Sequence, residues 1–341
     1  MRAREIGIEL GFFEPAPLNA ITDVEGVRVG HSTIIRGDDV RTGVTVVVPG
    51  ELPLFAAPFR LNGNGEMTGL EWVRESGLLT TPVAITNTFS VGVVRDAIVS
   101  AQHEAGRGEW HLPVVAETYD GRLNDIEGMH VEAEHLQEAL DSADGGPVAE
   151  GNVGGGTGMI CHGFKGGIGT SSRRVGDGYT LGVLVQANHG GRRRLAIDGV
   201  PVGLELGPEQ IPLPEEHEAG RAGSIIVVVA TDAPLLPHQC DRLARRAGLG
   251  IGRTGGAGET SSGDLILAFS TGNGDLERDE PVPVRMLPEA AINELFYGAI
   301  EATEEAIVNA LLAAETMTGR GATAYRLEPE LLAEVMRAHG R

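Results

Sequence analysis

One dipeptide, Gly223–Ser224, lies where a polar connector meets an apolar run. The connector, residues 206–223, holds three prolines and a Glu-Glu-His-Glu sequence, and the run 225–230 (Ile-Ile-Val-Val-Val-Ala) follows with no transition. An apolar, β-branched run of this length is typical of a strand that is buried on both faces. The hydroxyl of Ser224 therefore lies between an accessible loop and a rigid strand, which is a suitable place for a nucleophile.

A serine in this position can cut its own chain. Its hydroxyl attacks the carbonyl carbon of Gly223, water hydrolyses the resulting ester, and Ser224 becomes a new N-terminus. Glycine leaves this carbonyl unhindered and tolerates strained backbone dihedrals. The freed α-amine has an ordinary pKa of about 7.7–8.0, so it suits a general base that helps Ser224 attack a substrate. On the dipeptide alone, a Gly-Ser pair that merely ends a loop is the alternative interpretation, and it stays open.

Two further segments hold side chains that suit such chemistry. Ser262 and Asp264 open the apolar run 265–269, and the two-residue period of a strand puts both side chains on one face. A hydroxyl–carboxylate pair is therefore possible, although Ser, Gly and Asp also dominate ordinary turns. Asn188 follows the run 179–187, where its amide can donate to an oxyanion; a left-handed turn is the structural alternative.

Composition and charge limit the class of protein. Hydrophobic residues make up 41% of the 341 residues, and no apolar segment is long enough to span a membrane, so we expect a globular, cytoplasmic protein. The formal net charge of -21 argues against nucleic acid or a membrane surface as a partner. Strands and helices alternate without an interdomain linker, so we predict a single catalytic domain, 1–341, where length alone suggests about two.

No cofactor or metal is expected from the motifs. The two cysteines, Cys161 and Cys240, form neither a disulfide framework nor a zinc-binding spacing. The glycine-rich segment 151–158 matches neither the G-x-G-x-x-G motif nor the P-loop, which ends in Gly-Lys-Ser/Thr. Phosphate binding is therefore not predicted there.

Apolar periodicity and turn residues place the secondary structure. Strands are predicted at 21–29, 42–48, 81–86, 112–117, 167–175, 179–187, 225–230 and 265–269, and helices from beyond Asn87 to about Gln102 and at 131–142, 235–247, 294–315 and 328–338. Gly248 is expected to end the helix before it, and the helix 294–315 to be amphipathic. Gly92 inside a helix costs about 1 kcal/mol against alanine, so we expect close packing or a ligand there.

Seven segments together resemble the DmpA/BapA family of L-aminopeptidase/D-esterase and β-aminopeptidase enzymes. They begin at Asn62 (Asn-Gly-Asn-Gly-Glu-Met-Thr-Gly), Ile85 (Ile-Thr-Asn-Thr), Val115 (Val-Ala-Glu-Thr-Tyr-Asp-Gly), Leu184 (Leu-Val-Gln-Ala-Asn-His-Gly), Gly223 (Gly-Ser-Ile-Ile-Val-Val-Val-Ala-Thr-Asp-Ala-Pro-Leu), Ser261 (Ser-Ser-Gly-Asp-Leu-Ile-Leu-Ala-Phe-Ser-Thr) and Ala302 (Ala-Thr-Glu-Glu-Ala-Ile). The similarity extends from about residue 15 to 325, with the segments in the family order. Such a set is far more specific than any of the single motifs.

The resemblance implies a fold and an overall reaction. The fold is an α/β (α+β) four-layer αββα sandwich, layered like the N-terminal nucleophile hydrolases but connected differently. The chain is expected to cut itself into 1–223 and 224–341 and to remove N-terminal residues from small peptides, amides or esters through an acyl-Ser224 intermediate. Homo-oligomers, typically tetramers of the cleaved unit, are also implied.

The resemblance also assigns roles to site residues. Ser262 and Asp264 match the pair that orients the nucleophile and relays protons, and Asn188 matches the oxyanion donor. Tyr119 matches a tyrosine that lines the site, and Glu117 is expected to bind the ammonium group of the substrate. One position departs from the family pattern: the relay carboxylate of characterised members is a glutamate, and Asp264 is one methylene shorter.

Two other functions remain as alternatives. Ornithine acetyltransferase-like proteins share a similar fold and self-processing but transfer the acyl group to an amine, and they usually process at threonine, which Ser224 disfavours. An uncleaved, non-catalytic binding protein is the second alternative. Against it, Gly223, Ser224, Asn188, Ser262 and Asp264 are all present, so nucleophile, proton relay and oxyanion donor are complete.

Overall fold

A computed structural model describes residues 1–108, 110–214 and 223–341. Two sheets dominate it. The four-stranded sheet has the order β1 (Arg28–Arg36), β2 (Val40–Val48), β5 (Val83–Asn87), β6 (Val114–Thr118), and the six-stranded sheet has the order β4 (Leu78–Leu79), β3 (Leu54–Gly63), β12 (Gly263–Ser270), β11 (Ile225–Thr231), β10 (Tyr179–Ala187), β9 (Gly167–Val175). Residues 215–222 of the predicted connector, which include its Glu-Glu-His-Glu sequence, lie outside the described residues.

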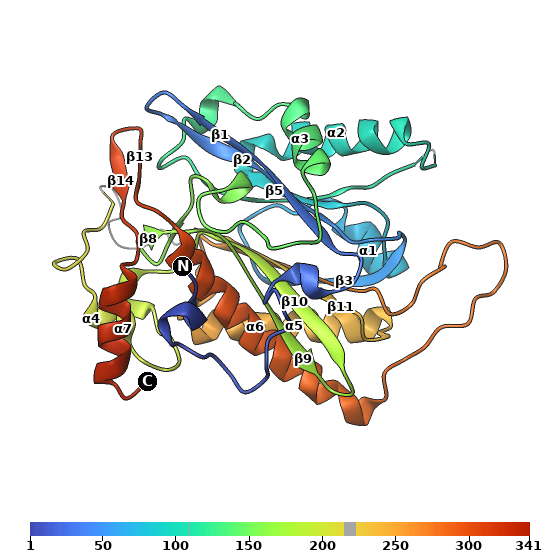
Figure 1. The fold of residues 1–341 in the computed structure, drawn as a ribbon. Coiled ribbons are helices and arrows are strands. Elements are labelled where there is room, and N and C mark those ends of the chain that lie inside the picture. The colour runs from blue at the N-terminus through green and yellow to red at the C-terminus, as the bar shows by residue number, and fades with distance from the viewer. Residues whose placement is uncertain (109, 215–222) are drawn as a thin grey trace.

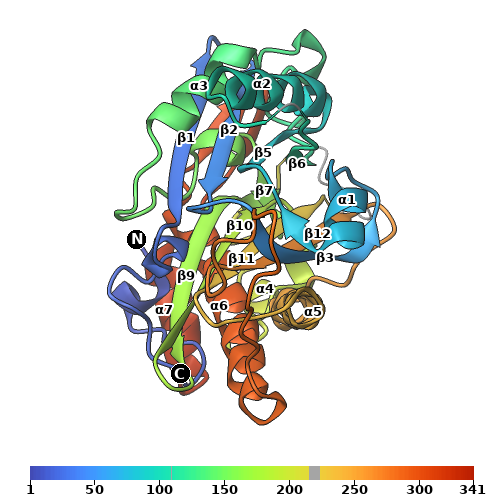
Figure 2. The ribbon, with the colours of Figure 1, turned by 90° about the vertical axis from the view of Figure 1, so that its right-hand side faces the viewer.

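Helices cover the outer face of each sheet (Figures 1 and 2). The helices are α1 (Leu70–Ser76), α2 (Val91–Glu104), α3 (Ala133–Asp141), α4 (Val202–Glu205), α5 (Pro237–Arg253), α6 (Ile292–Ala313) and α7 (Pro329–Ala338). Helices α2 and α3 pack on the four-stranded sheet, and α5 and α6 on the six-stranded sheet. The expected four-layer αββα sandwich is confirmed. Two short hairpins, β7–β8 (Ile160–Cys161, Phe164–Lys165) and β13–β14 (Met317–Gly319, Ala322–Ala324), complete the structure.

Strand β11 shows why the apolar run folds as it does. Ile225, Val227 and Val229 point into the core under α5 and α6, while Ile226 and Val228 point into the core between the two sheets. All five side chains are fully buried, and each full burial of this kind stabilises the fold by about 1.5–3 kcal/mol. The strand that follows Ser224 is therefore held from both faces.

Three predicted elements need correction, two of them in their bounds and the third, α6, in its burial. The segment 21–29 is mostly not a strand: Ile21–Asp23 is a 3₁₀ turn, and β1 begins at Arg28. Helix α5 does not end at Gly248 but continues to Arg253. It continues because its glycines allow close packing; a β-carbon at Gly250 would lie 2.6 Å from the carbonyl oxygen of Ile300 in α6.

The long helix α6 is not amphipathic in the expected way, because most of its polar positions are buried as well. Glu301 and Glu305 meet the fully buried Arg173 of β9, whose Nη2 lies 2.7 Å from the carboxylate of Glu305. Buried charges are tolerated when they are paired in this way. Glu301 and Glu305 therefore hold α6 on the sheet.

The glycine-rich segment 151–158 has a packing function. It lies against both sheets, through contacts with β2, β5 and β9. A β-carbon at Gly155 would lie 2.2 Å from the side chain of Gln186, and one at Gly156 would lie 2.5 Å from the backbone nitrogen of Ile168. Glycine is required at these positions because backbone and neighbours approach so closely.

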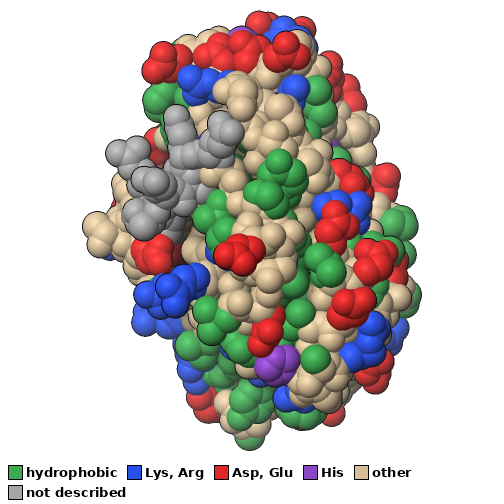
Figure 3. Space-filling view, turned by 90° about the vertical axis from the view of Figure 1, so that its left-hand side faces the viewer, with side chains coloured by type: hydrophobic (Ala, Val, Ile, Leu, Met, Phe, Trp, Pro, Cys, Tyr) green, Lys and Arg blue, Asp and Glu red, His purple; other side chains and the backbone are tan. Residues whose placement is uncertain are grey.

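The surface mixes acidic and basic side chains on the face drawn in Figure 3. Among the described residues, no helix combines the length and the apolar character needed to cross a bilayer.

Candidate active site

Ser224 lies at the entrance to β11, between two neighbouring strands. Its side chain is almost completely buried, and its Oγ accepts a hydrogen bond from the backbone N–H of Gly263 at 3.0 Å. Its carbonyl accepts from the backbone N–H of Asn188 at 3.1 Å. The nucleophile predicted from the sequence is thus held through backbone groups of β10 and β12.

Gly223 lies directly against Asn188. A β-carbon at position 223 would lie 1.9 Å from the carbonyl oxygen of Asn188 and 2.7 Å from its side-chain Nδ2. Any other residue would have to displace this backbone. Besides an unhindered carbonyl and tolerant dihedrals, glycine is thus favoured at position 223 for a steric reason, its contact with Asn188.

Ser262 and Asp264 form the predicted pair. Because Asp264 is paired with Ile225 in the parallel register of β11 and β12, the two side chains lie beside the Gly223–Ser224 bond. Ser262 Oγ is 2.5 Å from Oδ1 of Asp264 and also hydrogen-bonds to the carbonyl oxygen of Gly223.

The hydroxyl of Ser262 has one proton for these two acceptors. Burial raises the pKa of Asp264 to about 6, against the opposing effect of its hydrogen bonds from Ser262 and from the backbone of Ile225. When Asp264 is protonated, it can donate to Ser262, and Ser262 can then donate to the carbonyl oxygen of Gly223. The pair therefore offers a proton path that ends at the carbonyl to be attacked.

The end of β3 and the residues that follow it hold Ser262. Asn62 Nδ2 donates to the carbonyl oxygens of Ser262 and Glu259, the second at 2.8 Å, and the backbone N–H of Asn64 donates to Ser262 at 3.2 Å. Gly65 lies so close that a β-carbon would approach Gly263 Cα to 2.9 Å. The sequence signal was the Asn-Gly-Asn-Gly segment, which entered only as part of the family resemblance.

Asn188 has both ends of its amide engaged. Its Oδ1 accepts from the backbone N–H of Ile160 at 2.7 Å, and its Nδ2 donates to the carbonyl oxygen of Tyr119 at 3.0 Å. An amide nitrogen carries two hydrogens, and Tyr119 accepts one of them. The orientation of the amide is thus fixed, with Nδ2 beside Gly223.

Glu117 comes from the other sheet, near the end of β6. It is 3% exposed; the backbone N–H of Glu66 donates to its Oε1 at 2.9 Å, and the hydroxyl of Thr88 donates to its Oε2. Burial raises the pKa of Glu117, and these two hydrogen bonds partly oppose the rise. Glu66 and Thr88 were not identified from the sequence, because both reach Glu117 from distant loops.

A cavity of about 590 Å³ lies between the groups around Ser224 and Glu117 on the other sheet. Its lining includes Gly223, Ser224, Asn188, Glu117 and Tyr119, and the side chain of Tyr119 is 45% exposed. The structure thus brings five predicted site residues to one cavity, with Ser262 and Asp264 buried next to the Gly223–Ser224 bond.

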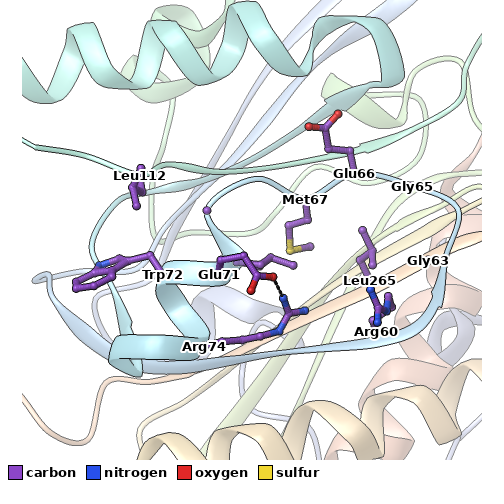
Figure 4. A pocket seen from close by; sticks show the side chains of 12 residues that line it. Arg60, Gly63, Gly65, Glu66, Met67, Glu71, Trp72, Arg74, Leu112 and Leu265 are labelled. Atoms are coloured by element: carbon purple, nitrogen blue, oxygen red, sulfur yellow. Dashed lines mark hydrogen bonds and ion pairs between the residues drawn. The ribbon is translucent and has the colours of Figure 1, made fainter.

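A second cavity, of about 430 Å³, adjoins the first (Figure 4). The two share Gly65 and Glu66. Figure 4 shows Glu66 pointing away from Arg74, which pairs instead with Glu71. The second cavity therefore lies behind the loop that holds Glu117, and none of the predicted catalytic residues lines it.

One buried group has the composition of a metal site. The ligand atoms of Cys161, His162 and His189 lie within 4.8 Å of one another, and within the described part of the chain Nε2 of neither histidine has a hydrogen-bond partner. The cysteine spacing gave no sign of this group, since its members meet only through the fold. Arg192 lies close to His162, and its positive charge opposes the entry of a further cation.

Known proteins resemble the chain over its whole length. The family model of peptidase family S58 matches residues 19–324. The β-peptidyl aminopeptidase BapA of Sphingosinicella microcystinivorans is 47% identical, with 100% of this chain and 93% of the relative covered.

Solved structures agree. A β-aminopeptidase of Burkholderia sp. has a TM-score of 0.93 at 52% identity, with 100% of this chain and 99% of that chain covered. The L-aminopeptidase D-Ala-esterase/amidase of Ochrobactrum anthropi, described as a variant of the Ntn hydrolase fold, has a TM-score of 0.92 at 44% identity, with the same coverage. The resemblance found in the sequence motifs is confirmed. The chain belongs to peptidase family S58 and is a hydrolase of the serine aminopeptidase and amidase kind.

Proposed function

We propose that the chain, as one catalytic domain, cuts itself between Gly223 and Ser224 and then uses Ser224 as the nucleophile of an aminopeptidase. The observation that carries this proposal is the arrangement at the Gly223 carbonyl. Ser262 donates to the oxygen of this carbonyl and is hydrogen-bonded to Asp264. The hydroxyl that attacks belongs to Ser224, the residue directly after Gly223. The cut yields chains of 223 and 118 residues.

Self-cleavage begins when Ser224 Oγ attacks the carbonyl carbon of Gly223. The oxygen of Gly223 gains negative charge in this step, and the hydroxyl of Ser262 stabilises it. The C–N bond then breaks, the nitrogen of Ser224 takes the proton that Oγ loses, and an ester remains. Water hydrolyses this ester to a Gly223 carboxylate and a free Ser224 with both amine and hydroxyl.

Turnover repeats this chemistry on a substrate. The α-amine of Ser224 takes the proton from Oγ as Oγ attacks the substrate carbonyl, and the leaving amine receives a proton as the bond breaks. Asn188 Nδ2 donates to the oxyanion, a role whose loss typically lowers the rate by about 10²–10³. Water then releases the acyl group from Ser224.

Glu117 is the proposed anchor for the substrate ammonium, and Tyr119 forms the wall beside it. An ammonium group that enters next to a buried carboxylate is attracted strongly, because solvent screens the pair poorly. Since relatives at 47% and 52% identity are named for β-peptides, we include short peptides with an N-terminal β-amino acid among the substrates.

We further propose that the cleaved unit forms a homo-oligomer, a tetramer by family resemblance. Phe12 is 96% exposed and Leu249 57%, which gives apolar surface for such contacts. Light scattering after size exclusion tests this, and a species of 35.8 kDa would contradict it.

Denaturing intact-mass spectrometry tests the central step. Wild-type protein is expected as two chains, the smaller beginning at Ser224, and Ser224→Ala as one uncut chain. Purified cleaved protein is then assayed on aminopeptides, with and without an added amine acceptor. Uncut wild-type protein after long incubation would refute the nucleophile assignment, and transfer of the acyl group to the acceptor in preference to water would favour an acyltransferase.

A further inference from the structure

We propose that Arg320, together with Arg122, forms a carboxylate-binding subsite in the Ser224 cavity, so that the enzyme favours short peptides with a free C-terminal carboxylate. The inference rests on the proposed function and adds the other end of its substrate. Both arginines line the same cavity as Ser224 and Glu117.

The position of Arg320 is fixed by its backbone. It occupies the turn of the β13–β14 hairpin with φ of 51°, a left-handed conformation that is uncommon for a residue with a side chain. Its backbone N–H donates to the carbonyl oxygen of Asp38 at 3.0 Å, and its Nη1 donates to the carbonyl oxygen of Gly121 at 2.7 Å. The guanidinium is therefore directed to the cavity segment that contains Gly121.

The hairpin itself is docked against that segment. A β-carbon at Gly319 would lie 2.0 Å from the carbonyl oxygen of Leu123, so the two backbones are in close contact. Arg41 Nε donates to the carbonyl oxygen of Thr318 at 3.0 Å. The charged tip of an otherwise exposed hairpin is thus held in one place, as a binding group requires.

The charges of the cavity are divided in a way that suits a zwitterion. Among the described residues, Glu66 and Glu117 are the acidic ones that line it, and Arg122 and Arg320 the basic ones. A peptide with its ammonium at Glu117 would meet the guanidinium groups with its carboxylate.

The wall of the cavity limits the length of such a peptide. Glu117 and Arg122 are five positions apart on one segment, which spans at most about 18 Å when fully extended. Residues 121–123 form a turn, which shortens this distance. This upper limit is of the length of a short peptide, so we expect the two ends to be bridged by a peptide of a few residues, whereas the C-terminus of a long chain would lie elsewhere.

The recognition chemistry is specific. A guanidinium has five N–H donors in a planar fork, which matches a carboxylate through two parallel hydrogen bonds. The carbonyl of Gly121 takes one donor of Arg320. A C-terminal amide has the same shape as the carboxylate but no charge, so it isolates this contact.

The test compares β-alanyl-leucine with β-alanyl-leucinamide. For cleaved wild-type enzyme, kcat/KM is expected to be about 10-fold or more higher for the acid, because charged hydrogen bonds are the strong ones. Arg320→Gln should reduce the ratio of the two kcat/KM values by about 10-fold or more, and Arg320→Lys, which keeps the charge but not the fork, by less. Arg95→Gln removes an arginine on α2 that does not line the cavity and should leave the ratio unchanged.

The outcomes separate this inference from the proposed function. If both substrates are hydrolysed and Arg320→Gln has the wild-type ratio, the subsite is refuted while the aminopeptidase stands. If the cleaved wild-type enzyme hydrolyses neither substrate nor any other aminopeptide, the proposed function is refuted, and the subsite is refuted with it. Intact mass of each variant, showing both chains, verifies that it folded and matured.

Discussion

The two sheets contribute to the cavity in different ways. The six-stranded sheet supplies Ser224, Ser262 and Asp264 from the adjacent strands β11 and β12 or the residues just before them, and Asn188 from the end of β10. These groups contact one another, so strand register sets their geometry. The four-stranded sheet supplies Glu117 from β6, with Tyr119 directly after β6 and Thr88 directly after β5.

Glu117 is held by loops rather than by its strand neighbours. Its partners, Glu66 and Thr88, lie outside both sheets, and Tyr119 beside it is partly exposed. The groups around the Gly223–Ser224 bond are thus set by the rigid sheet, whereas the surroundings of Glu117 depend on segments outside the sheets. Substitutions on the first side should affect self-cleavage, and those on the second should affect the choice of substrate.

The largest effect is expected from Ser262→Ala, on the six-stranded sheet. It removes the donor to the Gly223 carbonyl, so self-cleavage should slow by about 10²–10³. A time course of intact mass measures this, with Ser100→Ala on the exposed face of α2 as control. Cleavage of Ser262→Ala at the wild-type rate would show that its contact with Gly223 is not used.

Gly223→Ala should have a somewhat smaller effect on the same step. Its β-carbon would collide with Asn188 and move the scissile carbonyl, and a misplacement of about 1 Å can cost roughly 10²-fold in rate. Gly191→Ala is a matched control, because a β-carbon there meets nothing within 4 Å. Equal cleavage rates for the two variants would contradict the steric explanation.

Glu117→Gln changes the site residue contributed by β6 of the four-stranded sheet. The variant should still cut itself, so intact mass should show the same two chains as the wild type. The variant loses the negative charge that binds the ammonium, so KM for peptides should rise by about 10-fold or more. An N-acetylated ester, which lacks the ammonium, should show little change. Slower self-cleavage in this variant would contradict the assignment of self-cleavage to the six-stranded sheet and substrate binding to the four-stranded sheet.

Glu117 also predicts a pH dependence. Only its ionised form attracts an ammonium, and its pKa is raised by burial, so KM should increase as the pH falls through this raised pKa. The increase should begin at a higher pH than for a solvent-exposed glutamate, and it should be absent in Glu117→Gln. Initial rates from neutral to acidic pH measure it; a KM that does not change with pH would exclude Glu117 as the anchor.

The smallest effect is expected from Gly92→Ala, far from the chemistry. The close packing expected at Gly92 is wrong, since the residue is exposed and a β-carbon meets nothing within 4 Å. Alanine in the helix should therefore stabilise α2 by about 0.5–1 kcal/mol. A higher Tm with unchanged cleavage is the expected result, and a lower Tm would contradict it.

Sequence patterns over a few residues predicted the groups next to Ser224 better than the distant segments that contact them. Ser262 and Asp264 were placed on one face by strand periodicity, and the hairpin of β9 and β10 by its turn, because both depend on residues close in sequence. Strand β3 was missed, since Pro58 and its alanines weaken the strand pattern. The contacts of Asn62, Thr88 and Arg320 were missed because they join distant segments, which periodicity does not report.

The order of strands in the six-stranded sheet has a consequence for refolding. Its two middle strands, β11 and β12, lie in the proposed 118-residue chain, and their neighbours β10 and β3 lie in the 223-residue chain. Before the cut, these ladders join parts of one molecule, and folding does not depend on concentration. After the cut, two separate chains must associate to rebuild the sheet, so refolding of the denatured enzyme becomes a second-order process. The rate at which mature protein refolds should therefore fall as it is diluted.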